Sequence, residues 1–297
     1  MSNVRENPAA DDHWGRWGPD DEIGAANEIG SQATRRGLDA ATSGTVIPLA
    51  TPIRNGRGFG LVGRTPPAHF MLRSGSDYAA GLPERGGFGF ADDVVTMPTH
   101  GSTHVDALSH VWCEGRMYNG YTADSVTSRG ARHLGIDKMP PIVTRGVVVD
   151  TAPGGVRSVD DPVGPEELAD LLARADVELA PGDALLVRTG WLSAALRGEA
   201  DGTSWPGLDR TCGSWLAERR IALVGADNPG VEVFPSTDPG CQVPLHLALI
   251  RGCGVYFAEL MALDPLCKAG QACFLFVLSP LPIVGGVGSP VSPVAVL

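Results

Sequence analysis

The sequence lacks the patterns that mark several common classes of protein. Its six cysteines include no Cys-x-x-Cys pair, which fits neither a zinc ribbon nor a disulfide framework, so we expect reduced and mostly buried thiols. No Gly-x-Ser-x-Gly elbow occurs, which argues against a serine hydrolase. The N-terminus has neither the basic start nor the apolar core of a secretory signal, and we expect a cytoplasmic protein.

Positive charge is scarce as well. The 297-residue chain carries 23 Lys and Arg against 34 Asp and Glu, a formal net charge of -11, which repels a nucleic-acid backbone or an anionic membrane. Residues 269–297 contain no charged residue, but their prolines and glycines would break a membrane-spanning helix. We therefore expect a small-molecule partner, and neither a nucleic-acid nor a membrane partner.

The order of apolar segments along the chain predicts an α/β fold with mixed sheets. We expect residues 1–44, which are polar with few apolar anchors, to wrap the surface of a single domain formed by residues 45–297. Short β-branched runs predict strands at 45–49, 94–97, 146–151, 184–188, 221–225, 255–259, 273–278 and 294–297. Helical spacing of apolar residues predicts helices at 165–175, 191–196, 210–220 and 244–250. Strands and helices alternate in the second half, whereas the first half is richer in strands.

One short segment, THGSTHVDALSH, gathers three of the seven histidines. Its residues His100, His104, Asp106 and His110 all occupy even positions, so an extended chain would direct them to one face. On a straight strand, at roughly 3.3 Å per residue, His100 and His104 would lie about 13 Å apart. Two ligands that each lie about 2 Å from one metal ion cannot be so far apart. The chain must therefore bend between them.

Gly101 and Ser102 permit such a bend. A helix would also bring the two histidines to one face, but Gly-Ser-Thr is poor helix material, so we predict a strand that leads into a tight loop. Two imidazoles and a carboxylate suit zinc, manganese or ferrous iron and leave coordination positions open for water and substrate. The isolated histidines, His13, His69 and His133, are expected to be surface or hydrogen-bonded residues.

A second segment, PLHLALIRGCGVYFAEL, carries two polar groups in apolar surroundings. His246 lies in the predicted helix, and Glu259 ends an apolar strand, where an unpaired carboxylate would be costly. Each alone is best explained as a core group with a hydrogen-bond partner. Beside a metal cluster that is short of ligands, the pair becomes a candidate to complete it.

Three further charged residues, Arg188, Asp227 and Glu232, lie at or just beyond strand ends, where α/β proteins place functional groups. Structural ion pairing or capping is the favoured explanation for each of them. The alternative for Arg188 is that it binds a substrate carboxylate.

The histidine segment resembles a known signature. HGSTHVDALSH is similar to His-x-Gly-Thr-His-x-Asp-x-Pro-x-His of the cyclase family of metal-dependent hydrolases, which includes bacterial kynurenine formamidase and isatin hydrolase. The resemblance also takes in WGRWGPDDEIGAAN, RGVVVDTA, GDALLVRTGW and GGVGSPVSPVAV, and so covers most of the chain. Ser102 in the usual Gly position and Leu108 in the usual Pro position depart from the signature. Both alter the loop rather than the ligands.

The resemblance implies roles for individual residues. It makes His100, His104 and Asp106 ligands of a first metal ion, Zn²⁺ or Mn²⁺, and His110 the proton donor and acceptor. In a two-metal centre, Asp106 also touches the second ion, and His246 and Glu259 complete that site. The family fold is a swivelling β/β/α arrangement, usually in dimers or tetramers.

We therefore hypothesise hydrolysis of a small amide, lactam or lactone, with a metal-activated water and His110 as general acid and base. The main alternative is a non-haem Fe(II) oxygenase, in which His104, Asp106 and His246 bind iron and Arg251 holds an oxoacid cosubstrate. A third alternative is a non-catalytic metal scaffold, which predicts a fully enclosed site.

Overall fold

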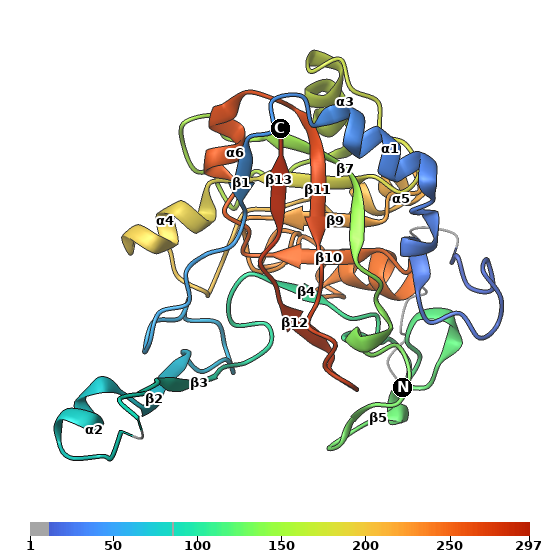
Figure 1. The fold of residues 1–297 in the computed structure, drawn as a ribbon. Coiled ribbons are helices and arrows are strands. Elements are labelled where there is room, and N and C mark those ends of the chain that lie inside the picture. The colour runs from blue at the N-terminus through green and yellow to red at the C-terminus, as the bar shows by residue number, and fades with distance from the viewer. Residues whose placement is uncertain (1–11, 85) are drawn as a thin grey trace.

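A single mixed sheet organises the chain. The computed structural model describes residues 12–84 and 86–297, and a nine-stranded sheet with the order β1-β13-β11-β7-β8-β9-β10-β4-β12 runs through them (Figure 1). Its four central strands are parallel: β7 (Ile142–Asp150), β8 (Ala184–Arg188), β9 (Leu223–Ala226) and β10 (Tyr256–Glu259). A strand that is buried on both faces has apolar residues at successive positions. This explains why runs such as ALLVR predicted the central strands well.

Antiparallel strands extend both sides of this parallel core. On one side lie β11 (Cys273–Leu278), β13 (Val294–Val296) and β1 (Val46–Pro48), and on the other lie β4 (His104–Asp106) and β12 (Gly288–Pro290). The predicted α/β fold with a mixed sheet is therefore confirmed. The strand β4 had no β-branched run of its own, and the sequence predicted only that the chain there is extended and bent.

Helices cover the sheet. They are α1 (Ser31–Ala40), α3 (Pro165–Arg174), α4 (Trp191–Arg197), α5 (Cys212–Glu218), α6 (Asp264–Ala269) and a π-helix (His246–Cys253). The helices predicted from spacing are confirmed, except that the last is wound as a π-helix, a form often found at functional sites. Helix α1 was not predicted, and it packs on β7 and β11 within the segment expected to wrap the surface.

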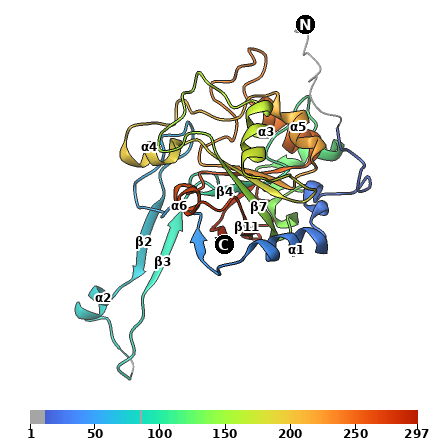
Figure 2. The same ribbon diagram turned by 90° about the horizontal axis from the view of Figure 1, so that it is seen from above.

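Short helices and two small hairpins complete the structure. The 3₁₀ helices are Gly24–Glu28, Tyr118–Gly120, Ala123–Ser125 and Ile136–Lys138. One hairpin pairs β5 (Val126–Thr127) with β6 (Gly130–Ala131). The other, which we call the arm (residues 68–96), pairs β2 (Ala68–Arg73) with β3 (Asp92–Thr96) and carries α2 (Gly75–Ala79) at its outer end. The arm projects away from the body in both ribbon views (Figures 1 and 2).

Two expectations about the whole chain concern thiols and membranes. No disulfide links the six cysteines, all of which lie within the described residues; Cys212 and Cys253 are buried, and the other four are partly buried. Among residues 12–84 and 86–297, no helix is long and apolar enough to cross a bilayer.

Candidate metal centre

Two buried strands supply three of the predicted ligands. The alternation of β4 directs His104 and Asp106 to one face, and the antiparallel register places Glu259 of β10 opposite His104. The Nε2 atom of His104 lies 3.2 Å from Glu259 Oε2 and 3.5 Å from Asp106 Oδ1. Two carboxylates thus converge on one imidazole in the interior of the sheet.

A tight turn brings His100 to the same point. Gly101 N donates to Pro98 O at 3.1 Å, and the turn that this hydrogen bond closes reverses the chain between β3 and β4. The Nε2 atom of His100 then lies 3.2 Å from Asp106 Oδ1. The predicted bend at Gly101 is therefore present. Arg64 holds the turn by donating from Nη1 to His100 O at 2.7 Å.

The π-helix contributes His246. Its Nε2 atom lies 3.5 Å from Glu259 Oε1 and 3.8 Å from Asp106 Oδ2. Its Nδ1 atom is 2.5 Å from Glu232 Oε1, and Glu232 also accepts from the backbone N–H groups of Leu245 at 2.8 Å and His246 at 3.1 Å. Glu232 thereby fixes both the start of the helix and the orientation of the imidazole.

The outer nitrogens of the other two histidines are also engaged. His104 Nδ1 is 2.8 Å from Ser102 O, and His100 Nδ1 is 3.0 Å from Thr99 Oγ1. A carbonyl accepts only, so His104 carries a hydrogen on Nδ1, and loss of the proton on Nε2 would leave that nitrogen to bind a metal ion. This is the arrangement that supporting hydrogen bonds impose on metal-binding histidines.

The inner atoms of the cluster are left without hydrogen bonds. Buried side-chain atoms that have no hydrogen-bond partner within the described residues include His100 Nε2, His104 Nε2, both Asp106 oxygens and Glu259 Oε1. Leaving so many polar atoms unsatisfied in the interior is costly. A divalent cation would satisfy all of them, so these residues fit a metal ion. We call His100, His104, Asp106, His246 and Glu259 the metal centre.

Electrostatics inside the metal centre favour ionised carboxylates. Burial opposes protonation of His104, but the carboxylates of Asp106 and Glu259 outweigh it and raise the pKa of His104 to about 9. His246 is likewise buried, and Glu232 and Glu259 raise its pKa to about 10. Burial would raise the pKa of Glu259, but the imidazoles of His104 and His246 hold that pKa at about 2. Protons on these imidazoles occupy the place that a metal ion would take.

Metal uptake is therefore expected to release protons. Because the pKa values of His104 and His246 are raised, the metal-free protein holds protons on both at pH 7, and a metal ion would displace about one to two of them. The affinity for the metal ion should therefore rise as the pH increases toward 9, because fewer protons then compete for the imidazoles. Calorimetry of Mn²⁺ binding in buffers with different ionisation enthalpies measures the number released. The same heat in every buffer would contradict this expectation.

His110 lies at the edge of the metal centre. Its ring stacks on His100, with the ring centroids 4.2 Å apart, and lies 6.4 Å from the ring of His246. Burial lowers the pKa of His110 to about 4, although the nearby Asp106 acts in the opposite direction. The imidazole is therefore neutral at pH 7 and able to accept a proton.

Glycine at position 288 leaves room for His100. A side chain on Gly288 of β12 would overlap the imidazole of His100. We expect Gly288→Ala to displace His100 and lower turnover on the order of 10²-fold, the effect of moving a catalytic group by about 1 Å. Turnover and Mn²⁺ affinity would be measured beside Gly155→Ala, where a Cβ meets nothing within 4 Å. If Gly288→Ala kept the wild-type turnover and Mn²⁺ affinity, the position of His100 in this structure would not be needed for either.

Glu232 is a residue whose role the sequence did not reveal. We expect Glu232→Gln to weaken metal binding about 10- to 100-fold, because His246 loses the carboxylate that orients it. Competition with a chelator of known affinity measures the change. The exposed Glu199, which pairs with Arg197, provides a matched Glu→Gln control. Unchanged affinity in Glu232→Gln would remove this supporting role.

The other strand-end residues lie in structural contacts. Arg188 is bonded to the carboxylates of Asp150 and Asp264, so the favoured structural explanation fits it better than a substrate contact. Asp227 accepts from the backbone N–H and hydroxyl of Thr189, each at 2.7 Å. Arg251 lies over the Trp14 ring, 4.6 Å from its centroid.

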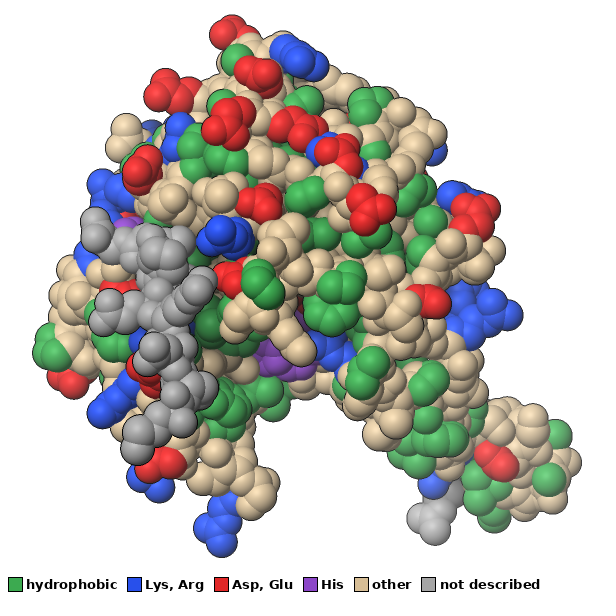
Figure 3. Space-filling model, turned by 180° about the vertical axis from the view of Figure 1, so that it is seen from behind, with side chains coloured by type: hydrophobic (Ala, Val, Ile, Leu, Met, Phe, Trp, Pro, Cys, Tyr) green, Lys and Arg blue, Asp and Glu red, His purple; other side chains and the backbone are tan. Residues whose placement is uncertain are grey.

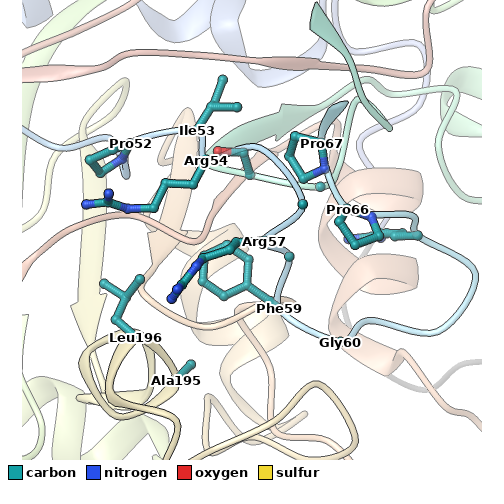
Figure 4. Close-up of a pocket in the computed structure, with 15 residues that line it drawn as sticks. Pro52, Ile53, Arg54, Arg57, Phe59, Gly60, Pro66, Pro67, Ala195 and Leu196 are labelled. Carbon is teal, nitrogen blue, oxygen red and sulfur yellow. The ribbon is translucent and has the colours of Figure 1, made fainter. Parts of the chain in front are cut away.

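A cavity of about 910 Å³ adjoins the turn that carries His100. Gly101 and Ser102 form part of its wall, and helix α4 faces them across it. In Figure 4 the side chains of Arg54 and Arg57 point to the same side of the cavity as Leu196. Seen from behind the molecule, histidine lies at the floor of a hollow with a Lys or Arg side chain beside it (Figure 3).

Comparisons with known proteins agree with this architecture. The Cyclase family model matches residues 36–233. A kynurenine formamidase from Geobacillus thermodenitrificans (strain NG80-2) is 26% identical over 206 residues, which cover 66% of this chain and 76% of the relative. A solved structure described as a novel cyclase is 33% identical, with a TM-score of 0.88, over 97% of this chain and 100% of that one. Isatin hydrolase A from Labrenzia aggregata shares the fold, with a TM-score of 0.66 and 21% identity over 84% of this chain and 93% of that one.

Proposed function

The chain belongs to the Cyclase family, and from this premise we propose that it is a metal-dependent hydrolase of small molecules. The observation that carries the proposal is the set of buried, inward-facing nitrogen and oxygen atoms that have no hydrogen bond within the described residues. In a purely structural cluster we would expect these atoms, which lie 3.2–3.5 Å apart, to be aligned for hydrogen bonds with one another. Their arrangement instead suits a cation that retains open positions for water and substrate.

Two overlapping groups of side chains, one within the metal centre and one that extends to His110 at its edge, could hold a metal ion. One comprises His104, Asp106 and Glu259, and the other comprises His100, Asp106 and His110. Asp106 belongs to both, so its carboxylate can serve one ion or bridge two. Zn²⁺ and Mn²⁺ suit this set of imidazoles and carboxylates. When bound, such an ion lowers the pKa of a water molecule toward neutrality and polarises a carbonyl oxygen.

His110 supplies the proton transfer in this proposal. It is neutral at pH 7 because burial lowers its pKa to about 4, so it accepts the proton of the attacking water. It then returns that proton to the leaving nitrogen or oxygen as the bond between the carbonyl carbon and that atom breaks. His100 stacks against it and so holds the ring at the edge of the metal centre.

The bond cleaved is proposed to be an amide, lactam or lactone. Support comes from the relative named a kynurenine formamidase and from the structural neighbours named isatin hydrolases. Arg54 and Arg57 line the adjoining cavity, and residues 52–67 contain three arginines and no acidic residue. We therefore propose that the substrate carries a carboxylate, which arginine binds well.

A substrate panel tests this assignment. The Mn²⁺-loaded protein would be assayed with an N-formyl aryl amine, isatin and an aryl lactone, each with and without a carboxylate on the ring. We expect carbonyl hydrolysis, with the acidic member of at least one pair preferred. Absence of hydrolysis together with oxygen uptake that depends on ferrous iron would favour the oxygenase alternative, in which His104, Asp106 and His246 bind iron.

A further inference from the structure

Two residues with left-handed backbone conformations adjoin the carboxylates that contact His246. Val231, with a φ of 60°, precedes Glu232, and Leu260, with a φ of 56°, follows Glu259. Both Val231 and Leu260 are fully buried. Positive φ is unfavourable for a branched or bulky side chain, and it persists only where surrounding contacts hold the backbone in place. The surrounding structure must therefore hold both residues.

Asn228 contacts both of these positions. It lies just beyond the end of β9, which is beside β10 in the sheet (Figure 1). Its side-chain oxygen accepts from the backbone N–H groups of Gly230 at 3.2 Å and Val231 at 2.6 Å. Its side-chain nitrogen donates to the carbonyls of Pro206 at 2.5 Å and Val231 at 3.2 Å. Its backbone carbonyl accepts from Leu260 N at 3.0 Å. The fully buried Asn228 thus bonds to the backbone of both strained residues.

The other backbone group of Leu260 is bonded as well. Thr103, which immediately precedes His104, donates from Oγ1 to the Leu260 carbonyl at 2.6 Å. With its N–H bonded to Asn228 and its C=O bonded to Thr103, Leu260 has a fixed orientation. The chain therefore leaves β10 in one direction, which fixes the backbone at Glu259.

The two carboxylates beside these strained residues contact opposite nitrogens of one imidazole. Glu232 Oε1 is 2.5 Å from His246 Nδ1, and Glu259 Oε1 is 3.5 Å from His246 Nε2. A shift of the backbone at either carboxylate would move the imidazole or leave it without one of these contacts. The position of His246 thus depends on both left-handed residues.

We propose that Asn228 is a positioning residue of the metal centre, which acts on His246 by holding Val231 and Leu260 in their left-handed conformations. The cost of these conformations is met when the chain folds, so the ligands need not rearrange when a metal ion binds. The role rests on the metal binding proposed above and is independent of the reaction.

Metal affinity measured for the full chain tests this role. We expect Asn228→Ala to weaken Mn²⁺ binding about 10- to 100-fold, as the loss of groups that orient metal ligands does, and to alter the visible absorption spectrum of bound Co²⁺. Competition with a chelator of known affinity measures the first effect. The control is Asn27→Ala, since Asn27 is exposed and bonds to Asp21 and Gly24 in the N-terminal segment. The control should keep the wild-type affinity and spectrum.

A second substitution separates positioning from a general loss of structure. Glycine adopts positive φ without a Cβ penalty, so Val231→Gly should recover most of the affinity that Asn228→Ala loses. Val231→Ala keeps the Cβ and should recover none. If Asn228→Ala does not fold, Asn228→Asp, which retains the accepting oxygen, is combined with the same two substitutions. Wild-type affinity in the Asn228 variant, or a glycine that recovers no more affinity than alanine, would overturn the positioning role alone. A wild type that binds neither Mn²⁺ nor Co²⁺ would overturn the metal centre and this role together.

Discussion

An Asp106→Asn variant is expected to lose both metal binding and hydrolysis. Asp106 lies within 3.8 Å of the inner nitrogens of His100, His104 and His246, and it belongs to both candidate ligand groups. At a Mn²⁺ concentration 100 times the dissociation constant, metal should stabilise the wild type by about 2.7 kcal/mol. Mn²⁺ should not stabilise the variant, and the turnover of the variant should fall to that of the metal-stripped wild type.

Thermal and chemical unfolding, each with and without Mn²⁺, measure this difference. Asp160→Asn, which changes an exposed acid away from the metal centre, should behave as the wild type. If Asp106→Asn were stabilised by Mn²⁺ as much as the wild type, the carboxylate could not be a ligand. The ligand assignment would then have to exclude Asp106.

His110→Ala is expected to separate chemistry from metal binding. His110 stacks on His100 at the edge of the metal centre, and its removal leaves the carboxylates in place. Turnover should fall about 10²- to 10⁴-fold, the usual contribution of a positioned acid or base, whereas the bound metal content should remain that of the wild type. Steady-state kinetics and elemental analysis on the same preparation measure both quantities.

The matched control is His133→Ala. His133 is partly exposed, stacks on Tyr121 and lies 3.5 Å from Glu22, so its loss should not affect turnover. Wild-type turnover in His110→Ala would assign the proton transfer to another group. Loss of metal in that variant would instead make His110 a ligand, as its place in one of the two ligand groups allows.

Much of the cluster was predictable because it is local in sequence. Alternation along a strand places His104 and Asp106 on one face, and the distance argument required a bend before them. The structure has both, with β4 at His104–Asp106 and a turn closed by Gly101. The central parallel strands were equally predictable, because burial on both faces leaves an unbroken apolar run.

The remaining features depend on contacts between distant segments. Glu232 supports His246 across 14 residues of irregular chain, and no spacing rule connects the two. Gly288 matters only because β12 pairs with β4 and brings its backbone against His100. The π-helical winding also has no signature in the apolar spacing, which predicted a helix and not its type.

The arm could not be read from propensity either. Its strand β3 was predicted from a β-branched run. Strand propensity does not show, however, whether a hairpin packs against the rest of the protein. Exposure of its apolar side chains became visible only in three dimensions.

Removal and restoration of metal test the central claim most directly. The protein would be stripped with a chelator, freed of it by dialysis, and titrated with Mn²⁺ or Zn²⁺ while hydrolysis of the best panel substrate is followed. We predict that activity disappears on stripping and returns in proportion to the metal bound. Full hydrolytic activity in protein shown by elemental analysis to be free of metal would contradict the account.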